Sequence, residues 1–265
     1  MRLELISREP TGAAASSTPL LFVHGAWHGA WCWEDHFLPY FAAQGYAAHA
    51  LSLRGHGQSE RPRGFKTMRI AQYVADVAQV AAQLPAPPVL IAHSMGGLVA
   101  QKYLERHSAA GAVLLASVPT RGVLRTTLAI AGHHPLRFAR ANATWSLWPI
   151  VNTPALAREQ FFTPATDDAT VRATLPRLQD ESYWAFLDMI AFALPRPARV
   201  RRKPVPLLVL GGERDGIFTP AEVRRTARAY GTAAELFPAM GHDMMLDTGW
   251  QAVADRILAW LRERF

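Results

Sequence analysis

Short apolar runs recur along the chain, and stretches with helical periodicity lie between them. The strongest runs cover residues 20–23, 89–92, 112–116 and 207–210, and weaker ones cover 3–6, 46–51 and 234–237. Runs of this length that end at Gly, Pro or His are typical of strands buried on both faces. Helical patterns cover 68–84, 98–106, 221–230 and 250–261. This alternation predicts an α/β fold with a mostly parallel sheet flanked by helices, and with its chemistry at the carboxyl ends of the strands.

One segment, residues 119–203, interrupts the alternation because it contains no convincing strand. It is rich in tryptophan and phenylalanine, and its frequent prolines favour several short helices over one long helix. We expect a helical cap here, inserted into a core formed by residues 1–118 and 204–265. The segment carries 12 basic and 6 acidic residues, against 16 and 15 in the rest of the chain. This local excess is most simply a solvated face, although it could also attract an anionic substrate or a membrane surface.

The composition narrows the class of protein. Of the 265 residues, 50% are hydrophobic and 18% are charged, which excludes a disordered chain. The single Cys32 excludes a disulfide framework and an all-thiolate metal site. No apolar run approaches the roughly 20 residues of a membrane span, and residues 1–10 do not resemble a secretory signal. We expect a cytoplasmic protein that binds a small molecule, without nucleic acid and without stable insertion in a membrane.

Residues 89–97 carry the strongest local signal, a buried apolar run that leads directly into a serine and two glycines. The sequence is Val89-Leu-Ile-Ala-His-Ser-Met-Gly-Gly97. A strand that turns directly into a helix strains the backbone of the central residue and exposes its side chain. We therefore expect Ser94 to be a nucleophile, with the N–H of Met95 directed at the group under attack. Ala92 stands where the usual motif has its first glycine, and one methyl group can be tolerated there.

A serine nucleophile needs a base, commonly a histidine that a carboxylate holds in place. For this kind of turn the order along the chain is serine, acid, histidine. Asp215 lies in the loop after residues 207–210, and His242 follows residues 234–237, so both come at carboxyl ends of predicted strands, as Ser94 does. Glu213 is the competing acid. We favour Asp215 because Gly-Gly-Glu-Arg-Asp-Gly places it deeper in the loop.

The glycine-rich turn after residues 20–23 is expected to complete the site. Gly25 allows the backbone to approach a ligand closely, and the N–H of Ala26 could then act beside that of Met95 as a second oxyanion donor. His24 and His28 flank this turn, and we expect them to stabilise the loop rather than to act as bases.

Taken together, these segments resemble the α/β-hydrolase fold superfamily over nearly the whole chain. The matching segments are His24-Gly25, Leu53-Arg-Gly-His-Gly-Gln-Ser59, Ala92-His-Ser-Met-Gly-Gly97, Gly212-Glu-Arg-Asp215 and Gly241-His242. Within the superfamily, the turn from His24 to Trp31 is similar to that of the plant methyl-ester hydrolases and hydroxynitrile lyases. The resemblance implies a triad of Ser94, Asp215 and His242, with Ala26 and Met95 as the oxyanion hole and residues 119–203 as the cap.

Two departures from the lyases favour ester hydrolysis. Those lyases have a threonine after the loop histidine and a lysine beside the catalytic histidine, whereas this chain has Gly25 and Asp243. Haloalkane dehalogenases use an aspartate nucleophile, which Ser94 excludes. Haloperoxidase-type perhydrolysis uses the same triad and stays open.

The sequence therefore predicts a serine hydrolase that cleaves carboxylic esters of small to medium, largely apolar substrates through an acyl-enzyme, with no cofactor and no metal. The expected substrate-binding residues are Trp27, Trp145, Trp148, Phe161, Trp184 and Phe218. The alternatives are other chemistry of this fold, namely lactone opening, C–C bond hydrolysis or perhydrolysis, and a ligand-binding receptor with little turnover. The triad argues against the receptor, because a protein that only binds needs no nucleophile.

Overall fold

A seven-stranded sheet forms the centre of the computed structural model, which describes all residues from 1 to 265. The strand order is β1-β3-β2-β4-β5-β6-β7, and every neighbouring pair is parallel except β1 and β3. The strands are β1 (Leu5–Arg8), β2 (Leu20–Val23), β3 (Ala48–Leu51), β4 (Val89–His93), β5 (Gly111–Leu115), β6 (Leu207–Gly212) and β7 (Ala234–Phe237). The central strands β2 to β5 are buried at every position, as their continuous apolar runs predict.

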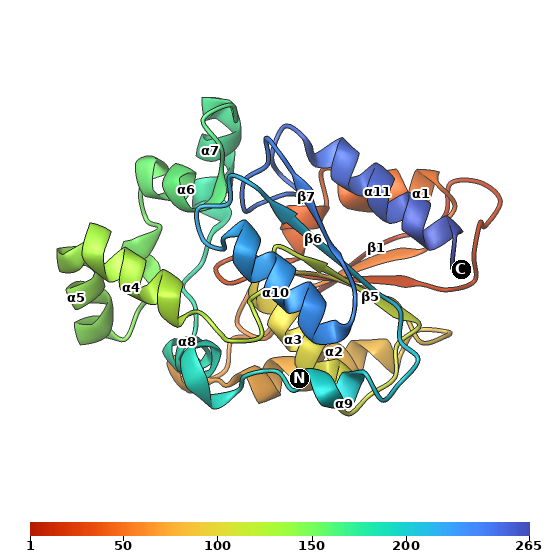
Figure 1. The fold of residues 1–265 in the computed structure, drawn as a ribbon, viewed down its shortest axis with the longest axis horizontal. Coiled ribbons are helices and arrows are strands. Elements are labelled where there is room, and N and C mark those ends of the chain that lie inside the picture. The colour runs from red at the N-terminus through yellow and green to blue at the C-terminus, as the bar shows by residue number, and fades with distance from the viewer.

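Helices cover both faces of this sheet (Figure 1). On one face lie α1 (Phe37–Ala43) and α11 (Trp250–Arg262), which pack against each other, and on the other lie α2 (Ile70–Ala81), α3 (Met95–Leu104) and α10 (Pro220–Tyr230). The apolar faces of α2 and α11 are buried against the sheet, as their helical periodicity predicts. The α/β fold class is therefore confirmed, and the single antiparallel pair is consistent with a mostly parallel sheet.

Between β5 and β6 the chain forms only helices and turns. They are α4 (Leu124–His133), α5 (Pro135–Thr144), α6 (Pro154–Phe161), α7 (Asp168–Thr174), α8 (Tyr183–Leu187) and α9 (Pro197–Val200), with the short helical turns 148–150, 175–177 and 188–192. Prolines begin α5, α6 and α9, where their missing N–H costs no hydrogen bond. We call residues 119–203 the helical insertion. Its helices α4 to α7 project from one end of the sheet (Figure 1).

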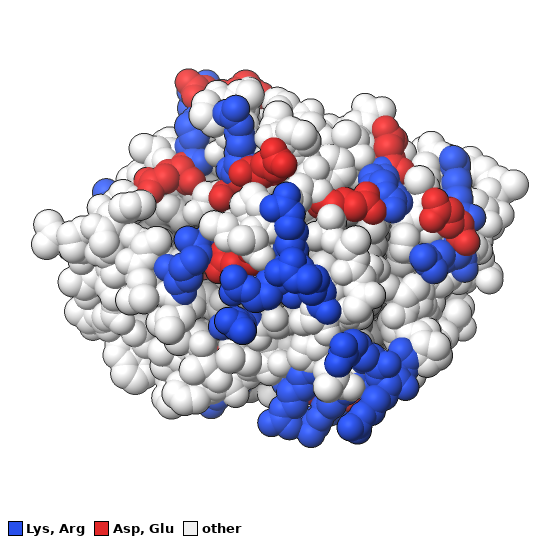
Figure 2. All heavy atoms as spheres, in the orientation of Figure 1, with Lys and Arg blue, Asp and Glu red and all other residues white.

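On the face of the molecule seen in Figure 2, exposed basic residues form separate groups rather than one continuous field. Figure 2 shows one group over α9 and another over α10, with acidic residues near the second. Arg199, Arg201 and Arg202 at α9 are exposed. No helix of the structure combines the length and the apolar character that a transmembrane segment needs.

Candidate active site

Ser94 occupies the turn between β4 and α3. Its φ of 51° and ψ of −117° lie in a region that side-chain-bearing residues rarely adopt, which is the strained turn that the sequence predicts. The two glycines that follow are required by space. A Cβ on Gly96 would lie 2.4 Å from the carbonyl oxygen of His24, and one on Gly97 would lie 2.2 Å from Ser117 Oγ. The start of α3 can therefore approach β2 and the loop after β5, with Ser94 at the carboxyl edge of the sheet.

Three side chains from distant parts of the sequence form one hydrogen-bonded chain at this edge. His242 Nε2 lies 2.9 Å from Ser94 Oγ, and His242 Nδ1 lies 2.9 Å from Asp215 Oδ2. Since the carboxylate of Asp215 can only accept, Nδ1 carries the proton, and Nε2 is free to accept the hydroxyl proton of Ser94. The other oxygen of Asp215 accepts from the backbone N–H groups of Ile217 (2.7 Å) and Phe218 (2.9 Å), which fixes the carboxylate.

The competing acid, Glu213, does not take part in this chain. Its side chain is exposed and makes no hydrogen bond, whereas Asp215 is the carboxylate in contact with His242. The difference follows from the loop after β6, in which Glu213 comes directly after the last strand residue and turns outward.

Two backbone N–H groups lie beside Ser94 without acceptors of their own. Met95 is the first residue of α3, where the N–H has no partner inside the helix. The N–H of Ala26 likewise makes no hydrogen bond to the protein. Both residues line the same cavity as Ser94. This arrangement can hold a developing negative charge on an oxygen next to Ser94.

The turn that carries Ala26 is tied to the loop of His242 by a buried ion pair. His28 Nε2 donates to Asp243 Oδ2 (3.0 Å) and its Nδ1 donates to the carbonyl of Ala26 (2.8 Å), with both side chains almost fully buried. Because both ring nitrogens face acceptors, His28 is an imidazolium. Burial alone would lower the pKa of His28, but the Asp243 charge and these hydrogen bonds raise it above its ordinary value. His28 therefore stabilises the turn, as expected, and gives Asp243 a structural role where the lyases have lysine.

His24 and His93 are buried neutral histidines of the same region. His24 Nδ1 donates to the carbonyl of Gly25 (2.7 Å), and Nε2 accepts from the N–H of Leu53 (3.0 Å). Burial and the neighbouring His56 lower the pKa of His24 well below its ordinary value. Burial and His242 lower the pKa of His93 to about 3. His93 Nε2 donates to the backbone carbonyl of His242 (3.0 Å), so it holds the backbone of His242 in place.

The closest approach to a metal-ligand set is His93, His242 and Asp243, which could place three ligand atoms within 4.8 Å of one another. Both ring nitrogens of His242 already contact Ser94 and Asp215, and His93 Nε2 is bound to a carbonyl. The cluster is therefore better described as a hydrogen-bond network than as a metal site.

A mostly apolar cavity lies over Ser94 and is partly open to solvent. The space within it, open solvent included, is about 650 Å³. Of its 17 lining residues 13 are hydrophobic, and none is charged. Trp27 and Phe218 line it, as expected. Trp145, Trp148, Phe161 and Trp184 do not.

Each of these four aromatic residues has another place in the structure. Trp145 is 49% exposed and stacks on Tyr183. Trp148 is half-buried in the turn 148–150, and Trp184 lies beside the guanidinium of Arg69. Phe161 is buried and packs against Trp27, His28 and His242, so it supports the site from behind.

Most of the cavity wall was not predicted from the sequence, and the helical insertion contributes the larger part of it with aliphatic, aromatic and polar side chains. The lining residues Thr126, Thr127 and Ile130 lie at helical spacing on one face of α4, and Val123 directly precedes this helix. That periodicity is visible in the sequence and could have identified this wall. The remaining wall comes from Val118, Phe138, Leu147, Ile150, Phe186, Met189, Ile217 and Gln160.

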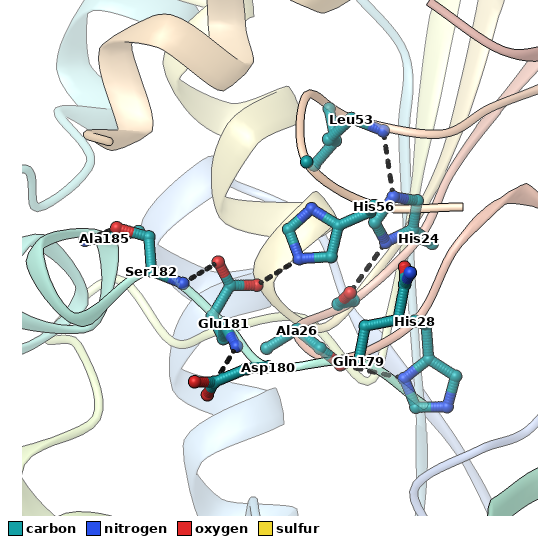
Figure 3. Close-up of polar contacts among 12 residues, drawn as sticks. His24, Ala26, His28, Leu53, His56, Gln179, Asp180, Glu181, Ser182 and Ala185 are labelled. Carbon is teal, nitrogen blue, oxygen red and sulfur yellow. Dashed lines mark hydrogen bonds and ion pairs between the residues drawn. The ribbon is translucent and has the colours of Figure 1, made fainter. Parts of the chain in front are cut away.

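Residues 179–182 join the insertion to the loops around the site (Figure 3). The N–H of Gln179 donates to the carbonyl of Trp27 (2.8 Å), and its side-chain oxygen accepts from the N–H of Gly57 (2.6 Å). Glu181 is fully buried, with Oε2 3.1 Å from His56 Nε2 and Oε1 2.7 Å from the hydroxyl of Tyr73. A carboxylate this deep is stable only with such partners, so this contact fixes the insertion on the sheet domain.

Comparison with known proteins assigns the family. A model described as the alpha/beta hydrolase family matches residues 20–256, so the chain belongs to the α/β-hydrolase family. It is similar to the pyrethroid hydrolase of Sphingobium wenxiniae, with 28% identity over 43% of this chain and 41% of the relative. It is also similar to a non-heme haloperoxidase of Rhodococcus erythropolis (35% identity; 39% of this chain, 38% of the relative) and to Methylesterase 3 of Arabidopsis thaliana (35%; 30% of each).

These alignments span less than half the length of each curated relative. Similarity that extends over the whole chain is found when the three-dimensional fold is compared with solved structures. The crystal structure of the Mycobacterium tuberculosis protein BpoC, named as a non-heme bromoperoxidase, superposes with a TM-score of 0.80 at 22% identity, covering 100% of this chain and 97% of that one.

Proposed function

We propose that the protein is a serine hydrolase that cleaves carboxylic esters of small to medium, largely apolar substrates. The observation that carries the proposal is the chain of two 2.9 Å contacts from Ser94 through His242 to Asp215. The apolar cavity without charged lining supports a neutral, hydrophobic substrate. The relatives named as a pyrethroid hydrolase and a methylesterase support ester chemistry.

In the proposed mechanism, Ser94 attacks the ester carbonyl while His242 Nε2 takes the hydroxyl proton. Asp215 holds the ring and stabilises its charged form. The N–H groups of Ala26 and Met95 bind the oxyanion, and one such donor contributes about 3–4 kcal/mol to transition-state stabilisation. His242 then gives the proton to the leaving alcohol, which leaves an acyl-enzyme on Ser94. Water, deprotonated by His242, attacks that acyl group, and the acid is released as Ser94 regains its proton.

We also propose that residues 119–203 act as a cap over this site. The cavity wall contributed by α4, by Leu147 and by Phe186 supports this role, because these residues line the same cavity as Ser94. A cap of this kind would exclude water from part of the cavity and select the acyl or alcohol group by size and polarity.

A fluorophosphonate probe, which labels activated serines, tests the nucleophile. We expect wild-type protein to be labelled and Ser94→Ala to be unlabelled. Asp215→Asn should lower kcat for p-nitrophenyl esters by about 10⁴-fold through the wrong histidine tautomer, while Glu213→Gln serves as the matched control and should change it little. Failure of the wild type to react would favour a receptor, and a large loss in Glu213→Gln alone would mean that the acid is misassigned.

Perhydrolysis is the second candidate because one relative is named as a haloperoxidase. It requires hydrogen peroxide in place of water in the second half of the same reaction. Peroxide-dependent bromination of a dye, compared with hydrolysis of p-nitrophenyl esters, lactones and β-diketones, separates these reactions. If kcat/KM for the peroxide-dependent reaction exceeded kcat/KM for every ester, perhydrolysis would replace ester hydrolysis as the proposed function.

A further inference from the structure

One polar side chain in the cavity has hydrogen-bonding groups that the protein does not use. Gln160, near the end of α6, lines the cavity and is only 5% exposed, and no hydrogen bond joins its amide to another residue. The other polar lining residues are already bound. Thr126 donates to the carbonyl of Ile217 (2.7 Å), Thr127 donates to that of Val123 (2.9 Å), and Ser94 contacts His242.

The amide atoms of Gln160 are not among the enclosed polar atoms that lack a partner, so water in the cavity can reach them. A substrate that displaces this water must replace its hydrogen bonds, whereas an apolar side chain of the same size would make no such demand. The amide of Gln160 has two donor hydrogens and one acceptor oxygen, so it can bind a keto oxygen or a hydroxyl group equally well. A charged group would find no opposite charge in the lining and would have to be desolvated without compensation.

The backbone around Gln160 is fixed to both loops that carry the proposed catalytic acid and base. The next residue, Phe161, accepts at its carbonyl from the N–H of Asp243 (2.9 Å), directly after His242. On the other side, Gly216 packs so closely on the carbonyl of Glu159 that an added Cβ would lie 2.5 Å from it, directly after Asp215. Gln160 thus has a defined position relative to Ser94, which a specificity contact requires.

We propose that Gln160 is a specificity-determining residue that binds one uncharged oxygen, of a keto or hydroxyl group, on an otherwise apolar ester. This inference rests on the proposed ester hydrolysis and names its substrate class more closely. A site with a buried hydrogen-bonding group discriminates against an analogue that lacks the partner, because that analogue leaves the group unsatisfied.

The test compares p-nitrophenyl hexanoate with its 4-oxo and 5-oxo derivatives, and hexyl acetate with its 4-oxohexyl and 5-oxohexyl counterparts. For wild type we expect kcat/KM for at least one keto ester to exceed that for the plain ester by about 10- to 100-fold, the range that an unsatisfied buried polar group produces. Gln160→Met keeps the side-chain size and removes the amide. It should lower kcat/KM for the keto ester and raise it for the plain ester, so that the ratio falls to about one. Gln83→Met, at an exposed glutamine, is the control and should leave the ratio unchanged.

A structural defect in Gln160→Met would lower both values together and leave the ratio intact, and that result would overturn the inference. Binding separates this failure from failure of ester hydrolysis itself. With Ser94→Ala and Ser94→Ala/Gln160→Met, quenching of tryptophan fluorescence by the same p-nitrophenyl esters gives Kd without turnover. A keto preference that disappears in the double variant supports the role of Gln160 even if wild type cleaves none of these esters. Equal Kd values for keto and plain esters in Ser94→Ala contradict it.

Discussion

At the scale of single residues, the site depends on how closely backbone segments approach one another. Gly25 is the clearest example, because a Cβ at this position would lie 2.9 Å from Ser94 Cβ and 2.8 Å from His93 Nδ1. A threonine at this position could not be accommodated unless Ser94 or His93 moved. A single missing side chain therefore sets the position of the turn at Ala26 against Ser94.

We expect Gly25→Ala to lower kcat by at least about tenfold and the free energy of unfolding by about 1–3 kcal/mol, since overpacking costs this much and displaces Ser94. Esterase assays and urea denaturation measure the two effects. Gly132→Ala in α4 is the matched control. A Cβ there meets nothing within 4 Å, so the change should stabilise the protein by about 0.5–1 kcal/mol and leave kcat unchanged. Normal activity in Gly25→Ala would show that the turn has more room than the contacts imply.

At the scale of elements, the helical insertion is held by a few buried polar contacts as well as by apolar packing. Glu181 is the central one, since its carboxylate binds His56, Tyr73 and the N–H of Ser182 (2.6 Å). The surface ion pairs of the insertion are of another kind. Asp168, for instance, is 74% exposed beside Arg158, and such pairs contribute little.

Glu181→Leu should lower the free energy of unfolding by about 3–5 kcal/mol, because it leaves buried partners without an acceptor. Asp168→Ala, the control within the same insertion, should change it by less than about 0.5 kcal/mol. Urea denaturation gives both values, and limited proteolysis shows whether cleavage begins between residues 119 and 203. If the two variants were equally stable, we would conclude that apolar packing alone holds the insertion against the sheet domain.

Helices and strands could be predicted from the sequence where a single interaction determines which residue types they contain. The central strands are recognisable because burial on both faces demands continuous apolar runs. Ser94 and Asp215 follow such strands, whereas His242 follows the half-buried edge strand β7. The helix α1 could not be predicted, because its seven residues, with Pro39 among them, are too few to show a helical repeat of apolar positions. Strand β1 pairs with β3 in the antiparallel direction. Its direction could not be predicted, because it depends on which strand becomes its neighbour. The pocket aromatics were assigned by type alone, although packing between helices decides whether Trp145 faces solvent or the cavity.

At the scale of the whole molecule, buried histidines of two kinds give stability a defined dependence on pH. His24 and His93 have lowered pKa values, so they stay neutral in the folded protein and take up protons in the unfolded chain below about pH 6.5. His28 has a raised pKa, so its contribution is complete below about pH 6.5 and is lost as pH rises through the raised value. Asp243, with a lowered pKa, loses its contribution only as pH falls below about 3.8.

Between pH 6.5 and 4.5 the free energy of unfolding should therefore fall with decreasing pH, by up to about 1.4 kcal/mol per pH unit for each of His24 and His93. Urea denaturation at pH 4.5, 5.5, 6.5 and 7.5 measures this slope. His93→Gln keeps a donor for the carbonyl of His242 and should reduce the slope by up to about 1.4 kcal/mol per pH unit. The contributions of His24, and of His36 and His49, whose pKa values burial also lowers, should stay. An unchanged slope in that variant would mean that His93 is not the neutral histidine described above.

The ion pair between His28 and Asp243 joins positions 215 residues apart. His28 also holds the carbonyl of Ala26, and Asp243 directly follows His242. This one contact therefore couples the turn on one side of Ser94 to the histidine loop on the other. Displacement of either partner would disturb both sides of the cavity at once.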